Sequence, residues 1–154
     1  MKLRDGLAFL LVVAALAAGC ANPTEVKDLT RELGSSKMVV DLASVLPTPW
    51  ERAYVFGDYE TAETMQSGLC LTWDGADLAS SFTKNDGMYV LVLVHDRSVV
   101  NWMTINALPN PQPAVAFTEE PPFFLERADA QLRVSAGPAG SLDLEPIMPN
   151  VPSC

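Results

Sequence analysis

Seven apolar residues in a row, Met88–Val94, form the most strongly patterned segment beyond the first twenty residues of the chain. An unbroken apolar run of this length is typical of a strand that is covered on both faces. A polar connection, 95–98, separates it from a second apolar-rich run, Val99–Ile105. The pattern therefore predicts a β-hairpin. The central pair Asp96-Arg97 is not one that two-residue turns prefer, which favours a longer loop.

An earlier strand is expected over Trp50–Phe56, where aromatic and branched residues are concentrated. Alternate side chains of a strand point to the same face. The shared face of this segment would hold Trp50, Arg52, Tyr54 and Phe56. Gly57 then favours a turn.

A short helix is expected after this turn. Thr61 has a side chain suited to the N-cap, and Gly68 lies near the expected end. The inner stripe, at helical spacing, comprises Ala62, Met65 and Leu69.

The remaining segments carry weaker patterns. A helix is expected over Thr24–Leu33 and is closed by Gly34. The segment Met38–Leu46 is ambiguous, with Met38–Val40 favouring a strand, and Trp73–Lys84 is expected to be a loop or a weak strand. Later strands are expected after a proline-rich loop or irregular edge, at Phe123–Glu126, Gln131–Ser135 and Ser141–Leu144. Together these elements predict a small α+β domain, mostly antiparallel sheet with one or two short helices.

The first residues have the layout of an export signal. Lys2 and Arg4 precede an apolar run, Leu7–Leu16, that is much shorter than the roughly 20 residues of a membrane-spanning helix. The string Leu16–Cys20 (LAAGC) resembles a bacterial lipobox, although such motifs often have Leu where this chain has Ala17. The alternative is an ordinary secretory signal that ends near a cysteine. The resemblance implies a signal peptide at 1–19, a lipidated tether with a short helix at 20–34, and one globular domain at 35–154.

Lipidation at Cys20 implies a stable attachment to a bilayer. One acyl chain, such as palmitate, binds a membrane only marginally, whereas two or three hold a protein firmly. The residue after Cys20 is Ala21 and not Asp, which resembles the outer-membrane sorting pattern of enterobacterial lipoproteins. The expected location is the cell envelope, on the periplasmic face of the outer membrane if the source has one.

The expected mature part is strongly acidic. Without Lys2, Arg4 and Asp5, the chain holds 8 basic and 18 acidic residues, a net charge of −10. Such a charge repels nucleic acid and anionic lipid headgroups, so no nucleic-acid partner is expected.

Two cysteines, Cys70 and Cys154, remain after Cys20. An even pair in an oxidising compartment favours a disulfide. Two free thiols and an intermolecular bridge are the alternatives.

Candidate catalytic chemistry is sparse. His95 is the only histidine, and Asp96 and Ser98 lie in the same expected turn, where residues do not easily adopt the geometry of a catalytic triad. One histidine and a cysteine pair provide no ligand cluster at zinc spacing. The segments 74–77 and 85–87 could attract calcium, but ordinary turns explain them better, because the regular oxygen-ligand loop is absent. Glu119-Glu120 could form a paired-carboxylate site, but a solvated pair in a proline-rich loop is favoured. No catalytic, cofactor-binding or metal-binding residue is therefore predicted.

Arg52 is the most suggestive polar residue, because it lies in mid-strand beside Trp50 and Tyr54. A guanidinium group in such a position can stack on an aromatic ring. It can anchor a carboxylate or a peptide, or it can hold the aromatic face through a local ion pair. The structural role is favoured, with expected partners Glu51, Asp58 or Glu60.

The segment Trp50–Tyr59 (WERAYVFGDY) resembles a pattern in small exported bacterial proteins of unassigned function. That pattern has Trp, an acidic residue, Arg, any residue, Tyr, an aliphatic residue and Phe, with a Tyr nearby. This chain departs from it at Asp58, where the group often has Pro. The resemblance implies the order strand, helix, hairpin, and it implies no chemistry.

The expected function is that of a non-enzymatic envelope lipoprotein, which binds or assembles with an envelope protein still to be identified. The alternatives are a small envelope hydrolase that uses carboxylates and an inhibitor of another envelope enzyme.

Overall fold

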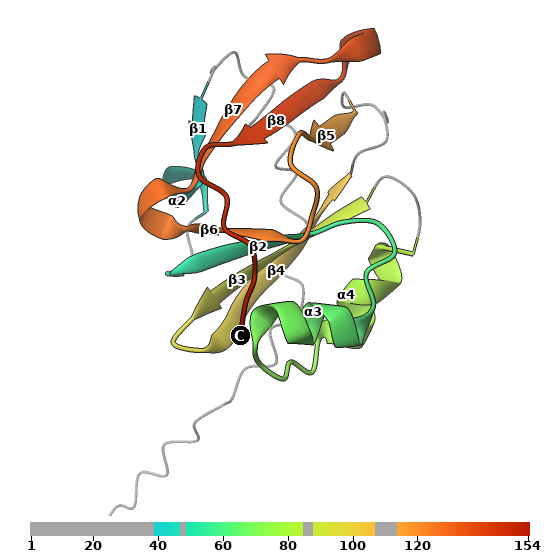
Figure 1. Ribbon diagram of the computed structural model, residues 1–154, viewed down its shortest axis with the longest axis vertical. Helices are drawn as coiled ribbons and strands as arrows, with labels where there is room; N and C mark the ends of the chain where they lie inside the picture. Colours follow the sequence, from blue (N-terminus) through green and yellow to red (C-terminus); the bar gives the residue numbers. More distant parts are fainter. Residues whose placement is uncertain (1–38, 47–48, 85–87, 107–113) are drawn as a thin grey trace, which may run out of the picture.

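The computed structural model describes residues 39–46, 49–84, 88–106 and 114–154 (Figure 1). Within them lie two four-stranded sheets and short helices, so the predicted α+β class, mostly antiparallel sheet, is confirmed. In chain order the elements are β1 (Val39–Asp41), α2 (Leu42–Val45), β2 (Arg52–Phe56), α3 (Ala62–Leu69), α4 (Ala76–Phe82), β3 (Met88–His95), β4 (Ser98–Asn106), β5 (Val115–Phe117), β6 (Phe123–Glu126), η1 (Arg127–Asp129), β7 (Gln131–Ala136), η2 (Pro138–Gly140) and β8 (Leu142–Pro146).

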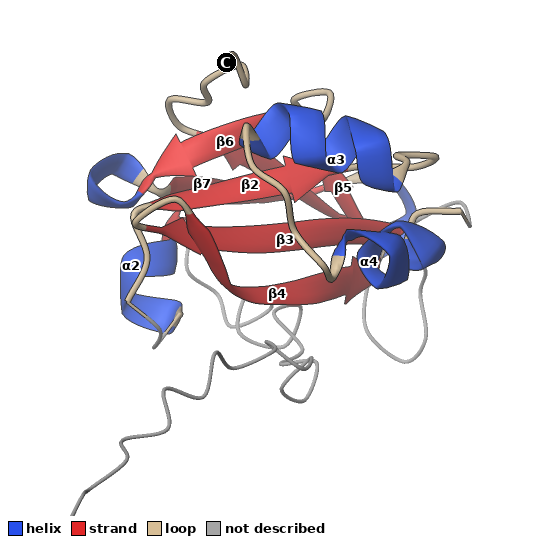
Figure 2. Ribbon diagram, turned by 90° about the horizontal axis from the view of Figure 1, so that it is seen from below, coloured by secondary structure: helices blue, strands red, loops and turns tan. Residues whose placement is uncertain are grey.

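One sheet, which we call the helix-covered sheet, has the strand order β4-β3-β2-β6 and is antiparallel throughout. The helices α3 and α4 lie against one of its faces (Figure 2). Phe56 and Val92 from the sheet pack there with Met65 from α3. Leu91 and Leu93 point to the opposite face and join a second core. Both faces of β3 are therefore buried, which explains its unbroken apolar run.

The other sheet, which we call the short-stranded sheet, has the strand order β1-β7-β8-β5 (Figure 1). Its strands pair antiparallel except for β5, which runs parallel to β8. Leu132 and Leu144 from this sheet pack with Val55 and Leu91 from the helix-covered sheet. Along β7, buried Leu132 is followed by exposed Arg133. The main core thus lies between the two sheets.

The predicted hairpin of β3 and β4 is confirmed, since the two strands pair antiparallel up to His95 and Ser98. The expectation of a longer loop is wrong, because Asp96 and Arg97 alone make the turn. Both have positive φ, 47° and 59°, as type I′ turns require. Asp tolerates this conformation better than most residues. Arg has no such preference, so the pairing of two long strands imposes the conformation on Arg97.

The helix predicted after Thr61 is confirmed as α3. The side chain of Thr61 accepts a hydrogen bond of 3.1 Å from the backbone N–H of Thr64, as an N-cap does. Met65 and Leu69 are buried on its inner side. The helix ends at Cys70, which adopts a left-handed conformation with φ 57°.

The prediction of a loop or weak strand over Trp73–Lys84 is wrong, because α4 lies within it. The buried residues of this segment recur at helical spacing, and they are Ala76, Ala79, Ser80 and Thr83. These residues are small or polar, so the hydrophobic pattern that identifies other helices is weak here. Phe82, the last residue of the helix, is partly buried and packs against Trp102, with ring centres 5.9 Å apart.

Other segments follow the expectations closely. The strand predicted at Phe123–Glu126 is β6, and the two later strands extend slightly further than expected, to Ala136 and Pro146. The ambiguous segment divides into β1 and α2. Residues 1–38, which include the expected signal, Cys20 and the first helix, lie outside the described residues, as does the turn at 85–87. Among the described helices, none is long and apolar enough to cross a membrane.

Candidate functional site

Arg52, Tyr54 and Phe56 share one face of β2, as predicted. The ring of Tyr54 lies 5.1 Å from that of Phe124 on the neighbouring strand β6. The guanidinium carbon of Arg52 lies 5.4 Å from the centre of the same Phe124 ring. Nε of Arg52 donates a hydrogen bond of 3.1 Å to Oε1 of Glu126. The strand pairing of β2 with β6 therefore builds a guanidinium–aromatic patch.

The guanidinium group of Arg52 is held in its charged form. A side-chain hydrogen bond with Tyr54 and the negative charge of Glu126 raise its pKa. The side chains of Arg52 and Glu126 are 50% and 44% exposed, so their ion pair is hydrated and contributes little to stability. An external anion can therefore reach Arg52, in competition with Glu126.

Trp50 does not belong to this face, contrary to the prediction. It precedes β2 and is buried in the core between the sheets, with 2% of its surface exposed. The arginine that lies over its ring is Arg127, 5.3 Å from the ring centre, and Nη1 of Arg127 donates to the carbonyl oxygen of Trp50 at 3.3 Å. The expectation that Arg52 pairs within its own segment is also wrong, because its ion-pair partner is Glu126 on β6. Strand pairing, which brings distant residues together, overrides proximity in the sequence.

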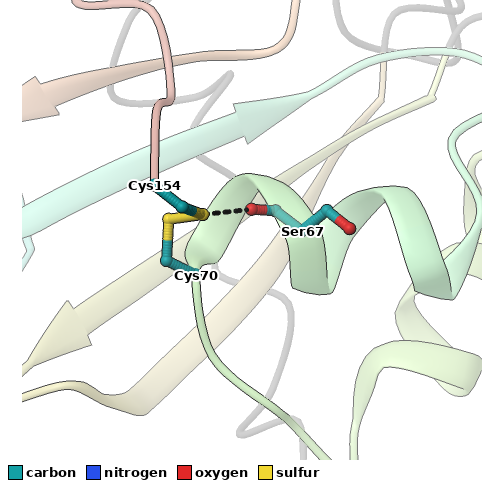
Figure 3. Close-up of a disulfide and its surroundings, with 3 residues drawn as sticks. All are labelled: Ser67, Cys70 and Cys154. Atoms are coloured by element: carbon teal, nitrogen blue, oxygen red, sulfur yellow. Dashed lines mark hydrogen bonds between the residues drawn. A yellow bond between two sulfur atoms is a disulfide. The ribbon is translucent and has the colours of Figure 1, made fainter.

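Cys70 and Cys154 lie together at the end of α3, with their Cα atoms 5.5 Å apart and their sulfur atoms joined in a disulfide (Figure 3). The position of Cys70 at the C-cap exposes its side chain to the last residues of the chain. Sγ of Cys154 also lies 3.0 Å from the carbonyl oxygen of Ser67. A disulfide sulfur carries no hydrogen, so this is a close contact that becomes a hydrogen bond only when the thiol forms.

An open groove of about 610 Å³ adjoins the disulfide. Its lining residues are Ala62, Glu63, Gln66, Ser67, Cys70, Leu71, Thr72 and Asp77. Gln66 accepts a hydrogen bond of 3.0 Å from the backbone N–H of Trp73 and so fixes the loop that forms one side. Burial raises the pKa of Glu60, but this carboxyl group is not among the lining residues. The acids that line the groove are Glu63 and Asp77, so its wall is polar and carries negative charge.

His95 is placed beside two carboxylates at the end of the hairpin. Its Nδ1 lies 3.6 Å from Oε1 of Glu51, and its Nε2 lies 3.5 Å from Oδ2 of Asp96. The backbone N–H of Asp96 faces Oε2 of Glu51 at 3.4 Å. One ligand atom from each of the three residues lies within 4.8 Å of the others, a spacing at which they could hold a metal ion.

The other candidates from the sequence form no constellation. Ser98 pairs with His95 across the turn, but no hydrogen bond joins their side chains in the part of the chain that the structure describes. Glu119 and Glu120 are exposed.

The sequence patterns pointed to Glu51 only as a partner of Arg52, and they gave no sign of Glu126 or Phe124. Glu51 lies 45 positions before Asp96, and it meets His95 because β2 and β3 pair with Arg52 opposite Val94. The segments could be recognised as strands, but the register between them could not. No local motif in the sequence marks these contacts.

No family model, no curated protein and no solved structure matches this chain. Its function is therefore inferred from its own residues.

Proposed function

We propose that this chain is an exported protein of the bacterial cell envelope, anchored to a membrane through lipid on Cys20. Its folded part binds another envelope component and does not catalyse a reaction.

The observation that carries the proposal is the placement of Cys70 against Cys154. Disulfides form and persist outside the reducing cytosol and are rare within it. The export signal expected at 1–19 leads to the same kind of compartment. The signal and the cysteine pair are independent of one another, and both support export.

The Arg52 patch supports a binding role. Arginine and aromatic side chains are enriched at the centres of protein interfaces. Here a half-exposed Arg52 lies over Phe124, which is itself only partly buried. The net negative charge of the expected mature part favours a partner with basic or neutral groups over nucleic acid.

The anchor is tested by comparing the wild-type chain with Cys20→Ser after expression in a Gram-negative host. The wild type should partition into detergent and have an intact mass that includes acyl chains, whereas the variant should remain aqueous and unacylated. A wild-type protein without acyl mass, in the aqueous fraction, would contradict the anchor.

Export is tested separately by non-reducing peptide mapping of the same material. The peptides that contain Cys70 and Cys154 should be linked. Two thiols that react with an alkylating reagent before reduction would contradict the oxidising location, whatever the state of Cys20.

A further inference from the structure

At the end of the hairpin, one ligand atom from each of Glu51, His95 and Asp96 lies within 4.8 Å of the others. Nδ1 of His95 lies 3.6 Å from Oε1 of Glu51, and Nε2 lies 3.5 Å from Oδ2 of Asp96. A zinc ion that binds N and O ligands at about 2.0–2.2 Å in tetrahedral geometry separates those ligands by roughly 3.3–3.6 Å. Nδ1 of His95 and Oε1 of Glu51 have about this separation. The side chain of Asp96, which is 85% exposed, can turn its carboxylate toward the same ion.

The imidazole of His95 provides an independent observation. Its Nδ1 atom is buried and has no hydrogen-bond partner among the described residues, although buried polar atoms in proteins are nearly always bonded. The side chain as a whole is 40% exposed. A ring nitrogen that makes no hydrogen bond is therefore held 3.6 Å from a carboxylate oxygen of Glu51, on a side chain that is partly open to solvent.

The charges around the imidazole favour a cation. Glu51 and Asp96 contribute two carboxylates, and two nearby arginines, Arg52 and Arg127, use their guanidinium groups elsewhere. Arg52 is paired with a glutamate on β6, and Arg127 donates to the carbonyl oxygen of Trp50. The two carboxylates are thus left to face His95.

We propose that Glu51, His95 and Asp96 bind a divalent transition-metal ion, with zinc as the best fit. One imidazole nitrogen and two carboxylate oxygens form a donor set used by zinc, whereas calcium and magnesium take oxygen ligands. Three protein ligands leave a coordination position for water or for a donor from a partner. The proposal adds a ligand to the hairpin and does not depend on the lipid anchor.

The single histidine of the chain makes the direct test simple. The full chain carrying Cys20→Ser is purified oxidised and without a histidine tag, so that neither a free thiol nor a tag binds the ion. In an NMR titration, zinc should shift the single set of imidazole signals, that of His95, and the shift should saturate at one ion per chain. Magnesium chloride at the same concentration should not shift them. Imidazole signals that do not move at saturating zinc would overturn the proposal.

Variants separate this site from general binding to an acidic surface. Glu51→Gln and Asp96→Asn should each weaken zinc binding by at least about tenfold. Loss of an outer-shell partner of a metal ligand already costs about 10–100-fold, and loss of a ligand should cost no less. Asn also tolerates the left-handed conformation of the turn, so Asp96→Asn keeps the hairpin even if Glu51→Gln disturbs it. Glu63→Gln, an exposed change on α3, is the matched control and should leave the affinity unchanged. An equal loss in all three variants, or no loss in Glu51→Gln and Asp96→Asn, would overturn the proposal.

Discussion

The helix-covered sheet and the short-stranded sheet use their faces differently. In the first, successive residues of β3 are buried, with Leu91 in the core between the sheets and Val92 against the helices. In the second, β7 buries Leu132 and exposes Arg133. One sheet is a layer between two cores, whereas the other closes a single core and presents its outer face to solvent. The difference predicts which positions tolerate polar residues.

The largest expected effect follows directly from this difference. Leu91→Asn and Val92→Asn should each cost roughly 3–5 kcal/mol, because each removes apolar contacts and buries an amide without a partner. On β7, Leu132→Asn should cost about as much, but its neighbour Arg133→Asn should cost less than about 1 kcal/mol, since it removes only a hydrated ion pair. Urea unfolding of the four variants measures this. Unequal losses at Leu91 and Val92 would mean that one face of β3 is open.

The same contrast explains how much of the fold could be predicted. The continuous apolar run of β3 indicates a two-sided strand without knowledge of its neighbours, and the Thr61 cap identifies α3. The inner stripe of α4 contains Ala79 and Thr83, which carry little hydrophobic signal. The division of the strands into two sheets, and the parallel pairing of β5 with β8, depend on long-range packing that no local pattern encodes.

The disulfide lies on the helix-covered side and should have the next largest effect. It closes a loop with a sequence separation of 84 residues, for which loop-closure entropy predicts about 4.5 kcal/mol at most. Cys70→Ala and Cys154→Ala should lose the same amount, and the double variant should lose no more than either, because each change breaks the same bond. Denaturant unfolding of the three variants measures this. A double variant that is much less stable than the single ones would show that the cysteines contribute separately.

A smaller effect is expected where the chain passes from one sheet to the other. Arg127 lies in η1, between β6 and β7, and both its backbone N–H and its guanidinium group bond to the carbonyl oxygens that precede β2. Arg127→Ala should cost about 1–2 kcal/mol, because it removes a hydrogen bond and a cation over the buried ring of Trp50. Arg52→Ala should cost less than about 1 kcal/mol, because its ion pair is hydrated. Melting temperatures of both variants measure the difference.

The Arg52 variant also distinguishes scaffold from binding residue. If Arg52→Ala keeps its melting temperature but no longer cross-links to the partner that the wild type captures in intact cells, then Arg52 contacts the partner. If Arg127→Ala loses capture only in proportion to its lost stability, its role is structural. If both variants still capture the partner, the binding surface lies away from this patch.

The candidate sites show the same limit of prediction as the fold. Cysteine counting was enough to bring Cys70 and Cys154 together as a hypothesis, since only two cysteines remain after Cys20. Glu51 and His95 could not be brought together by counting, because their contact depends on the register of β2 against β3. Arg52 was singled out correctly as a residue on an aromatic face, but its partner came from β6, whose pairing with β2 is equally nonlocal.

The smallest expected effect is the change in stability when a single glutamate is neutralised, and its sign should differ between Glu60, beside the helices, and Glu145, on the short-stranded sheet. Burial raises the pKa of Glu60, beside the helix layer, above the value of 4.5 expected when unfolded. An acid with a raised folded pKa contributes most to stability below its unfolded pKa, and this contribution is lost as the pH rises through the folded value. Glu60→Gln should therefore stabilise the protein at neutral pH, by less than about 1 kcal/mol because much of the side chain stays hydrated. The gain should vanish below about pH 4, where the wild-type group is protonated in both states.

The matched control lies on the open face of the short-stranded sheet. Glu145 forms an ion pair with Arg133 there, so Glu145→Gln should slightly destabilise the protein at neutral pH. Melting curves of both variants at pH 4 and pH 7 provide the comparison. The two changes remove the same charge from the same acidic chain, so a general relief of repulsion would stabilise both variants equally. Opposite signs at pH 7 would instead assign the effects to local surroundings, which are desolvation by burial for Glu60 and a hydrated ion pair for Glu145.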